Sequence, residues 1–412
     1  MECNGAMGEW KECQLGNVLT FQRGFDLPHS KMAEGPYPVM GSNGIIGWHN
    51  EYTTEAPSVT IGRSGSVGRP HLLTIPSWSH NTVLFVKDFK GNDPRFLYYF
   101  LFTLRLNEYG GGSAVPTLNR NVLHELKVCI PDLAAQRRIA AVLGALDDKI
   151  EVNRKICENL EAQAQALFKA WFVDFEPFGG KRPEGWKEVS LLDVVELFDM
   201  KRIPLSSRER EKRKGQFPYY GATSIMDYVD DYLFDGVYLL MGEDGSVARE
   251  DGIPYLQYIS GKFWVNNHAH IMQGRNGYST EMLWCALSQT DISTFVTGAV
   301  QPKLSQTNMQ MIKVPILAMG EMRRFGERVQ PMFDMLRTKR EESRALAAMR
   351  DALLPKLMSG ELAVEKVEVA DACASLTGQG ASRTGQGASH TGQGVSRTGK
   401  ELMVVENFKR SE

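Results

Sequence analysis

An internal duplication constrains the fold of this 412-residue chain more than any other feature of its sequence. The offset between matching residues is 176 at the start, then 180, and 186 from Trp78 onward. Chance does not keep one offset across about 60 residues, so the chain holds two copies of one segment of roughly 180 residues. The matching positions are 10–12 with 186–188, 37–45 with 217–225, 61–68 with 241–248, Trp78 with Trp264, Lys127-Val128 with Lys313-Val314, and Arg137-Arg138 with Arg323-Arg324.

Each copy begins with a stretch that is typical of a mostly β domain. Short runs such as SVTIGRSGSVG, NTVLFV, GVYLLMG and ELKVCIP are separated by turn residues at short spacing. This pattern predicts short strands joined by irregular loops. One apolar segment in each copy, at 93–106 and 279–290, predicts an embedded helix. We call residues 8–131 head 1 and residues 181–317 head 2.

The remainder of each copy predicts one long helix with a heptad seam. In the first copy the helix is expected from Pro131 to about Phe172, a rod of roughly 60 Å. The same register, shifted by 186, survives in the second copy with a more polar middle. The seam positions are Ile139, Leu143, Leu146, Ile150, Asn153, Cys157, Leu160, Ala164, Leu167 and Trp171, then Phe325, Val329, Met332, Leu336, Lys339, Ser343, Leu346, Arg350, Leu353 and Leu357.

The two helices are the obvious partners for each other. Neither is apolar enough to be stable alone, because most helical stability comes from packing an apolar face. We expect antiparallel pairing as a coiled coil, in which the polar centre at 153–155 meets the polar centre at 339–343. Polar residues at seam positions fix the register at some cost in stability. The alternative is that the two seams bind other proteins.

Composition excludes several classes of protein. The net charge is −2, whereas a lone DNA-binding domain is usually clearly basic, so nucleic-acid binding would need local patches or another subunit. No apolar run could span a membrane, and MECNGAMGEW lacks the features of a secretory signal. The six cysteines form no C-x-x-C pair, so neither a zinc site nor a disulfide framework is predicted, and we expect a cytoplasmic protein.

No catalytic, cofactor-binding or metal site is predicted. The chain has no G-x-G-x-x-G fingerprint opening a helix and no P-loop. Asp132 and the Asp147-Asp148-Lys149 group suggest a nuclease, but about 15 helical residues separate them by roughly 22 Å, too far to share a metal. The segment NNHAH at 266–270 has two histidines without further ligands, which favours surface or hydrogen-bonded roles.

Two similar heads on a helical spacer, without catalytic groups, suggest a protein that holds two binding domains at a fixed distance. Two reading heads about one helical turn apart, near 34 Å, would bind a bipartite site on duplex DNA. The chain resembles the specificity subunit of type I restriction–modification systems. The residues that carry the resemblance are PDLAAQRRIAAVLGALDDKIEVNRKICENLEAQAQALFKAWFVDFEPF at 131–178, PEGWKEVSLLDV at 183–194 and ALLPKLMSGEL at 352–362.

The resemblance implies an α+β fold with two target-recognition domains, two antiparallel helices between them and pseudo-twofold symmetry. It implies no cofactor on this chain. The helices would dock two methyltransferase subunits, which carry S-adenosylmethionine, and restriction subunits that use ATP and Mg²⁺ would join that complex on double-stranded DNA. The alternatives are a non-catalytic structural bridge without DNA recognition and a stand-alone enzyme, against which the missing cofactor motifs argue.

Candidates for DNA contact come from positions at which the two copies differ. Between Val67 and Trp78 the offset changes, so this loop differs in length and content while the flanking residues match. Base edges are read by Arg, Lys, Asn, Gln and hydroxyl side chains, although an unconstrained surface loop would look the same. The candidates in this loop are Arg69 and His71 in the first copy and Arg249, Tyr255, Gln257, Tyr258 and Lys262 in the second.

Two further sets complete the candidates. Arg63-Ser64 lies opposite Glu243-Asp244 on a glycine-flanked turn, which suggests guanine reading in one head and cytosine reading in the other, with turn chemistry as the alternative. The run KRIPLSSREREKRKG at 201–215 reads as a phosphate-facing loop or as a solvated charge run. Its basic residues are Lys201, Arg202, Arg208, Arg210, Lys212, Arg213 and Lys214.

The predicted division of the chain has five segments. Head 1 is followed by a helical spacer at 132–180, head 2 by a spacer at 318–362, and a tail occupies 363–412. The tail contains the repeat TGQGASR, which has too few apolar residues for a core, so we expect it to be flexible.

Overall fold

In the computed structural model of the chain, residues 10–110, 116–298 and 300–363 are described. The predicted tail at 363–412 therefore lies outside the described residues except for residue 363. The chain forms two compact units, and each is considered by itself. Unit 1 holds the residues up to Val152 together with those from Glu342 onward, and unit 2 holds Asn153–Glu341. Each unit thus takes one head with part of each long helix, and the five-segment division of the chain stays a prediction.

Unit 1 contains a four-stranded sheet of order β2-β8-β5-β6, a three-stranded sheet of order β4-β3-β7 and the pair β1-β9. Helix α2 starts where Asp93 accepts a hydrogen bond from the amide of Phe96 and where Pro94 occupies the first turn. The elements of this unit are β1 Lys11–Gln14, α1 Leu15–Val18, β2 Thr20–Arg23, η1 His29–Lys31, β3 Tyr37–Gly41, β4 Gly44–His49, β5 Ser58–Gly62, β6 Pro70–Leu73, β7 Trp78–Ser79, β8 Val83–Asp88, α2 Pro94–Thr103, η2 Leu106–Tyr109, α3 Arg120–His124, β9 Lys127–Ile130 and the beginning of α4 Leu133–Phe172.

Unit 2 contains a six-stranded sheet of order β11-β16-β14-β15-β12-β13 and the pair β10-β17. Ser279 caps α7 by accepting from the amide of Met282. The elements of this unit are η3 Glu176–Phe178, β10 Lys187–Ser190, α5 Leu191–Val194, β11 Val195–Leu197, η4 Asp199–Lys201, α6 Ser207–Lys212, β12 Lys214–Tyr220, β13 Ile225–Val229, β14 Phe234–Gly242, β15 Leu256–Val265, β16 Ala269–Gly274, α7 Thr280–Leu287, η5 Ser293–Phe295, α8 Gln306–Met309, β17 Lys313–Ile316 and the beginning of α9 Met319–Met358.

Strand pairing repeats between the two units. In unit 1, β3 and β7 run parallel and pair Val39 with Trp78. In unit 2, β12 and β15 run parallel and pair Tyr219 with Trp264. The offsets between these residues are those found in the sequence, 180 and 186. The single long strand β15 takes the place of both β6 and β7, while α6 has no counterpart among the described residues of unit 1. The duplication therefore extends to the topology of the heads.

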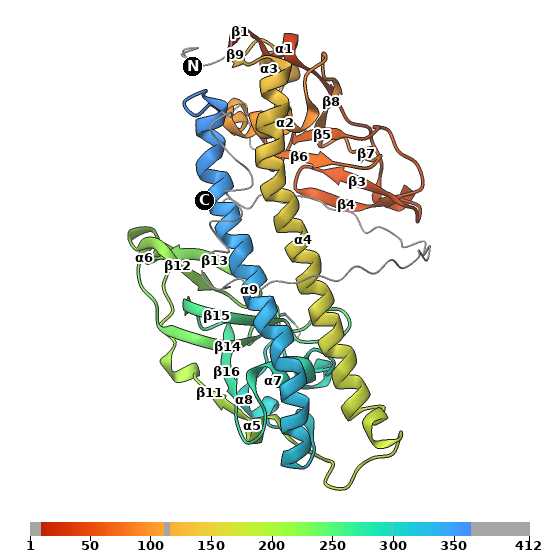
Figure 1. Ribbon diagram of the computed structural model, residues 1–412, viewed down its shortest axis with the longest axis vertical. Helices are drawn as coiled ribbons and strands as arrows, with labels where there is room; N and C mark the ends of the chain where they lie inside the picture. Colours follow the sequence, from red (N-terminus) through yellow and green to blue (C-terminus); the bar gives the residue numbers. More distant parts are fainter. Residues whose placement is uncertain (1–9, 111–115, 299, 364–412) are drawn as a thin grey trace, which may run out of the picture. The chain divides into compact units, whose positions relative to one another are not determined.

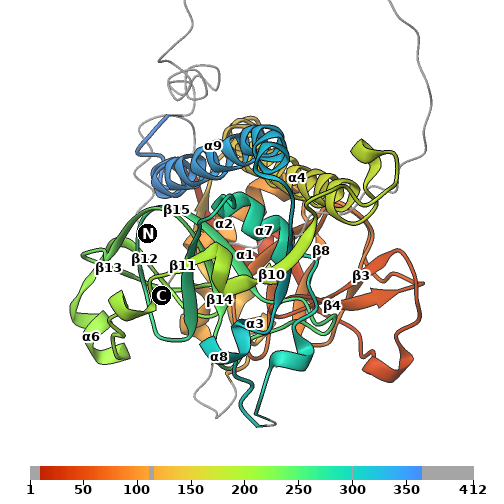
Figure 2. The same cartoon turned by 90° about the horizontal axis from the view of Figure 1, so that it is seen from below.

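Each unit has its own apolar core, to which the long helices contribute. The core of unit 1 joins Leu143 of α4 and Leu354 of α9 to residues of head 1 such as Phe96. The core of unit 2 joins Phe168 and Phe325 to residues of head 2, and the rings of these two phenylalanines meet edge to face with centroids 5.9 Å apart. In unit 2, strand β15 lies beneath α9 (Figure 2), where Arg340 donates to the carbonyl of Tyr258 at 3.0 Å.

Helices α4 and α9 lie side by side within each unit (Figure 1). In unit 1, Asp147 pairs with Arg350 at 2.5 Å, and Lys149, further along α4, pairs with Glu342 at 3.5 Å. In unit 2, Glu161 pairs with Arg340 at 2.7 Å. Further along α4 in that unit, the ring of Phe172 meets that of Phe325 with centroids 5.0 Å apart. In both units, advancing along α4 means moving back along α9, so the helical segments run in opposite directions.

Burial along the helices follows most of the expected seam, with a shift by one residue at two places in α9. In α9 the fully buried side chain between Val329 and Leu336 is Phe333, not Met332, and near the end it is Leu354 rather than Leu353. Asn153 is completely buried, and neither polar atom of its side-chain amide has a hydrogen-bond partner among the described residues. Buried seam positions are Ile139, Leu143, Leu146, Cys157, Ala164, Trp171, Phe325, Val329, Leu336, Leu346 and Leu357, and half-buried ones are Ile150, Leu160, Leu167, Met332, Lys339, Ser343, Arg350 and Leu353.

Cysteines and membrane segments are the last features that bear on the sequence predictions. Cys13, Cys157 and Cys285 are free thiols. Cys129 is disulfide-bonded. No disulfide framework is predicted from the sequence, and one bonded cysteine does not make such a framework. Within the described part of the chain, no helix has the length and apolar character needed to cross a bilayer.

Candidate nucleic-acid interface

The turn that carries Arg63 in head 1 and Glu243 in head 2 has the same backbone environment in both heads. The amide of Arg63 donates to the carbonyl of Thr82, and its carbonyl accepts from the amide of Leu118 at 2.9 Å. The amide of Glu243 donates to the carbonyl of His268, and its carbonyl accepts from the amide of Leu304 at 2.8 Å. The two side chains therefore leave the backbone at equivalent places, and only their charge differs.

In head 1 this turn borders an open pocket of about 460 Å³. Its polar lining consists of Arg23 at the end of β2, Arg63, Thr117, Asn119 and Arg120, and its apolar lining consists of the buried Leu84 and Leu118. Three arginines thus line one cavity. Arg23 has an ion pair with Asp26 at 3.6 Å, in which both side chains are more than half exposed.

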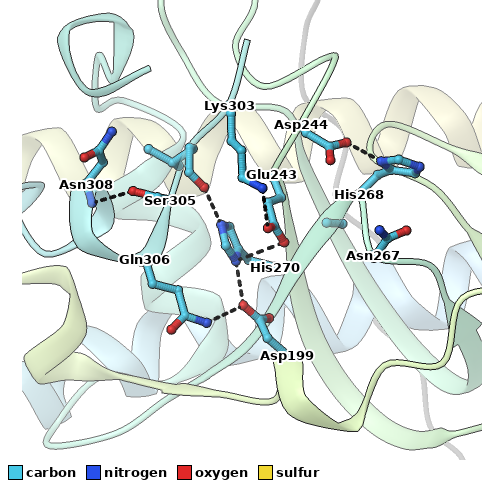
Figure 3. A network of polar contacts seen from close by, with 12 residues as sticks. Asp199, Glu243, Asp244, Asn267, His268, His270, Lys303, Ser305, Gln306 and Asn308 are labelled. Atoms are coloured by element: carbon cyan, nitrogen blue, oxygen red, sulfur yellow. Dashed lines mark hydrogen bonds and ion pairs between the residues drawn. The ribbon is translucent and has the colours of Figure 1, made fainter. Parts of the chain in front are cut away.

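In head 2 the equivalent place holds a network of buried polar groups (Figure 3). Asp199, whose side chain is 4% exposed, accepts from His270 Nδ1 at 2.6 Å, from the amide of Ile271 at 2.9 Å and from Gln306 Nε2 at 2.8 Å. Burial disfavours the charge of this carboxyl group, but the hydrogen bonds from His270, Ile271 and Gln306 outweigh burial and hold the pKa of Asp199 below its usual value.

Glu243 completes this network. Its carboxylate pairs with Arg202 at 2.5 Å and with Lys303 at 3.6 Å, and its side chain is 14% exposed. His270 Nε2 faces the carbonyl oxygen of Leu304 at 2.8 Å, so both ring nitrogens of His270 face acceptors (Figure 3). The ring is thus held between the carboxylate of Asp199 and the carbonyl of Leu304.

Asp199, Glu243 and His270 also bring potential metal-ligand atoms within 4.8 Å of one another. The donors Arg202, Lys303 and Gln306 already bind the two carboxylates. A divalent cation would have to displace these donors, so the group is an internally paired ion network in which the charges satisfy one another.

Comparison with known proteins decides the family. The model of the type I restriction modification DNA specificity domain matches twice, over residues 7–162 and 183–342, one match for each copy of the duplication. The chain belongs to this family. The two matches together cover most of the described chain, and each includes one head with the beginning of the long helix that follows it.

Individual relatives are distant. The chain is 28% identical over 306 residues to the specificity subunit of the type I restriction enzyme MjaIX from Methanocaldococcus jannaschii, which covers 66% of this chain and 70% of that protein. It is 34% identical over 131 residues to a putative type I restriction enzyme specificity subunit of Haemophilus influenzae, which covers 32% of each. The crystal structure of the S subunit of the type I restriction–modification system from M. genitalium matches with a TM-score of 0.54 and 20% identity over 86% of this chain and 97% of that one, which shows a common fold.

Two candidate DNA contacts of this specificity-family chain are corrected by burial. His71 is fully buried in β6, where it contacts the carbonyl of Ser42 at 3.3 Å. Tyr258 is buried in β15 and donates to Glu281 at 2.7 Å, and Arg337 donates to its hydroxyl group. The sequence predicts a variable loop for both residues because the two copies differ there. In the structure, however, both side chains are buried inside a head. They cannot contact DNA.

The corrected role of His71 gives a pH prediction. Burial, opposed by the Ser42 hydrogen bond and assisted by Arg69, lowers the pKa of His71 to about 4. The unfolded chain takes up a proton near its ordinary pKa of about 6.5, so the folded state loses stability as pH falls from about 6.5 to about 4. We expect the free energy of unfolding to drop by about 1 kcal/mol per pH unit in this window. Urea unfolding at several pH values should show that the free energy of unfolding depends less on pH in His71→Gln than in the wild type. An equal pH dependence would contradict the lowered pKa of His71.

The expected reading of cytosine by Glu243 stays a prediction, and it would require Glu243 to leave its present partners. The carboxylate is held by Arg202 and Lys303, so it is not free to accept from an amino group of a base. Its neighbour Asp244 contacts Nδ1 of His268. Gln257 donates to the carbonyls of Gly221 and Ala222, at 3.0 and 3.1 Å, and thus supports a turn of head 2.

Some residues of the basic run form ion pairs within head 2, and the remaining candidates differ in how exposed they are. Arg210 pairs with Asp227 at 3.2 Å, with both side chains near one-eighth exposed, and Lys214 pairs with the same carboxylate at 2.7 Å. Arg213 pairs with Asp230 at 2.9 Å. Of the other candidates, Arg63, Ser64, Arg69, Arg202 and Tyr255 are half-buried, and Lys201, Arg208, Lys212, Arg249 and Lys262 are exposed.

Sequence reasoning missed most of the groups at the equivalent turns. Arg23, Thr117 and Arg120 in head 1, like Asp199, Lys303 and Gln306 in head 2, come from segments far from the turn in sequence. The offsets of 180 and 186 would have aligned the turn and the segment at 117–120 with their counterparts. They could not show that these segments meet, because that contact is made only in the folded head.

Proposed function

We propose that this chain gives a type I restriction–modification complex its DNA specificity, with each head reading one half of a bipartite duplex site. The observation that carries the proposal is that the specificity-domain family matches once on each copy of the duplication. Both copies keep one topology, while the side chains at the equivalent turn differ in charge. A common scaffold with different polar groups is what the reading of two different half-sites requires.

The helices supply the second part of the proposal. We infer that α4 and α9 form an antiparallel coiled coil that sets the gap between the half-sites, and that their outer faces dock two methyltransferase subunits. In this proposal the chain itself is non-catalytic, and S-adenosylmethionine is bound by the methyltransferase subunits, while restriction subunits bind ATP and Mg²⁺. Sharing the DNA with basic partners is consistent with the net charge of −2.

Exchange of one head tests this proposal. Co-expression of the chain with the methyltransferase of its own operon, followed by genome-wide mapping of methylated adenine, is expected to give one split motif with a fixed gap. Replacement of residues 8–131 by the corresponding head of a family member with a known motif should change one half and leave the other half and the gap unchanged.

Replacement of residues 181–317 is the matched control and should change only the opposite half. A motif that changes in both halves after either exchange would contradict independent reading. An intact complex that methylates no defined motif would instead indicate a structural bridge.

A further inference from the structure

We propose that head 1 contains a phosphate-binding pocket formed by Arg23, Arg63 and Arg120, whereas head 2 has replaced this pocket by a permanent internal ion network. The proposal rests on the function proposed above and identifies the pocket's ligand as a phosphate of the DNA backbone. It also predicts that the two heads contribute unequally to the electrostatic part of DNA binding.

The pocket and the network occupy the same place in the fold. Arg23 pairs in register with Leu84 across β2 and β8. In unit 2, Asp199 follows β11 and contacts His270 of β16, the residue that corresponds to Leu84 at the offset of 186. Position 23 therefore corresponds to position 199, the same offset of 176 that relates the starts of the two copies.

The other two sides of the pocket also correspond. Arg63 and Glu243 share the backbone hydrogen bonds described above, and Ser64 and Asp244 form isolated bridges to Thr117 and Lys303. Asn119 and Ser305 each cap the short helix that follows, and the next residues are Arg120 in head 1 and Gln306 in head 2. Each of the three arginines is therefore replaced in head 2 by a carboxylate or an amide.

The charge of the head 1 pocket is left largely uncompensated. No hydrogen bond or ion pair of the Arg63 and Arg120 side chains occurs with any described residue, and the pair of Arg23 with Asp26 is exposed enough to contribute little. Burial first, and then the charge of Arg120, lower the pKa of the neighbouring His124. His124 Nε2 accepts from the amide of Phe21 at 2.9 Å, which a neutral ring allows. The site is therefore positive, and none of the described residues that line it is an anion.

A phosphate group has the chemistry that this pocket fits. Guanidinium groups bind phosphate oxygens through two parallel N–H bonds, and Thr and Asn side chains are common neutral phosphate contacts. The buried Leu84 and Leu118 border these polar groups on the protein side, where there is less water to screen their charge. In head 2, by contrast, the carboxylates of Asp199 and Glu243 would repel a phosphate, and their cationic partners are already bound.

Salt dependence measures the proposed interaction. The complex of the full chain with its methyltransferase is bound to a duplex that contains the motif found above, over a series of salt concentrations. For Arg63→Gln/Arg120→Gln we expect about tenfold weaker binding near 0.15 M salt. The slope of log K against log salt should fall in magnitude by about 1, because one phosphate is no longer neutralised by the protein. The methylated motif should stay the same, because phosphate contacts carry no sequence information.

The matched control removes two charges from head 1 away from the pocket. Arg105 and Lys127 have side chains 80% and 82% exposed, in pairs with Glu108 and Glu12. Arg105→Gln/Lys127→Gln should leave both affinity and slope near the wild-type values. Equal melting temperatures of the two double variants will show that neither effect comes from unfolding.

The outcomes separate the possible sources of the phosphate. Stabilisation of the full chain by inorganic phosphate, abolished in Arg63→Gln/Arg120→Gln, together with the reduced DNA slope, supports the proposal. Stabilisation by inorganic phosphate with an unchanged DNA slope assigns the pocket to a free phosphate compound and overturns the DNA assignment. If Arg63→Gln/Arg120→Gln changes one half of the methylated motif, the assignment to a backbone phosphate is overturned in favour of base reading. If the wild-type complex binds its duplex and the variant behaves identically, the pocket proposal alone fails. If the wild-type complex methylates no motif, the proposed function fails with it.

Discussion

Replacement of Arg350 by methionine is expected to lower the free energy of unfolding of unit 1 by about 3–5 kcal/mol. The side chains of Asp147 and Arg350 are 4% and 12% exposed, and they pair at 2.5 Å between α4 and α9. Tyr99 of α2 also donates to Asp147. Without Arg350, the carboxylate of Asp147 would remain buried between three helices, and among the described residues only the tyrosine hydroxyl would still donate to it. A buried charge without its counter-ion is costly.

Urea unfolding followed by circular dichroism measures this effect, and an exposed pair supplies the control. Arg154 and Glu158 form an ion pair within α4 in which both side chains are about half exposed. Arg154→Met should therefore cost less than about 0.5 kcal/mol. The double variant Asp147→Leu/Arg350→Met removes both charges and should regain most of the stability, because an apolar pair of similar volume often replaces a buried ion pair without loss. A double variant as unstable as Arg350→Met would contradict the buried-charge explanation.

Much of the fold could be predicted because the long helices and the duplication produce long, regular patterns in the sequence. The helix expected from Pro131 to about Phe172 is observed as Leu133–Phe172, and its copy as Met319–Met358. The embedded helices expected at 93–106 and 279–290 are observed as Pro94–Thr103 and Thr280–Leu287. Periodicity and a constant offset both average over many residues, so single substitutions do not hide them.

The site was harder to predict because it depends on which charges meet in space. The difference between Arg63 and Glu243 was visible, but the partners of Glu243 were not, since Arg202 precedes it by 41 residues. In the basic run, Arg210 looked available for phosphate, yet its pairing with Asp227 of β13 makes it part of the head. His71 was misplaced for a similar reason, because a difference in loop length does not show which side of a strand faces the core.

Replacement of Asp199 by alanine is expected to lower the free energy of unfolding of unit 2 by about 3–5 kcal/mol and to abolish recognition of the half-site read by head 2. The carboxylate accepts hydrogen bonds from His270, the Ile271 amide and Gln306, and all three donors would be left without this acceptor. The same network fixes the turn at 243–245 and the segment at 303–306 beside it. Because the pKa of Asp199 is held low, this stabilisation is present above the ordinary carboxyl pKa and is lost as pH falls below it.

Thermal and urea unfolding, together with the methylation map, measure both effects. Asp230→Ala is the control, because Asp230 is half exposed in its pair with Arg213, and it should cost less than about 1 kcal/mol and leave the motif unchanged. The decisive comparison is the double variant Asp199→Ala/His270→Leu. Head 1 has Leu84 at the position of His270, so a leucine is compatible with this place in the fold. Removing the imidazole also removes a buried polar group that Asp199→Ala leaves without this acceptor, so the double variant should be more stable than Asp199→Ala alone. Additive losses would instead mean that His270 and Asp199 stabilise head 2 through separate contacts, and that the network does not act as one unit.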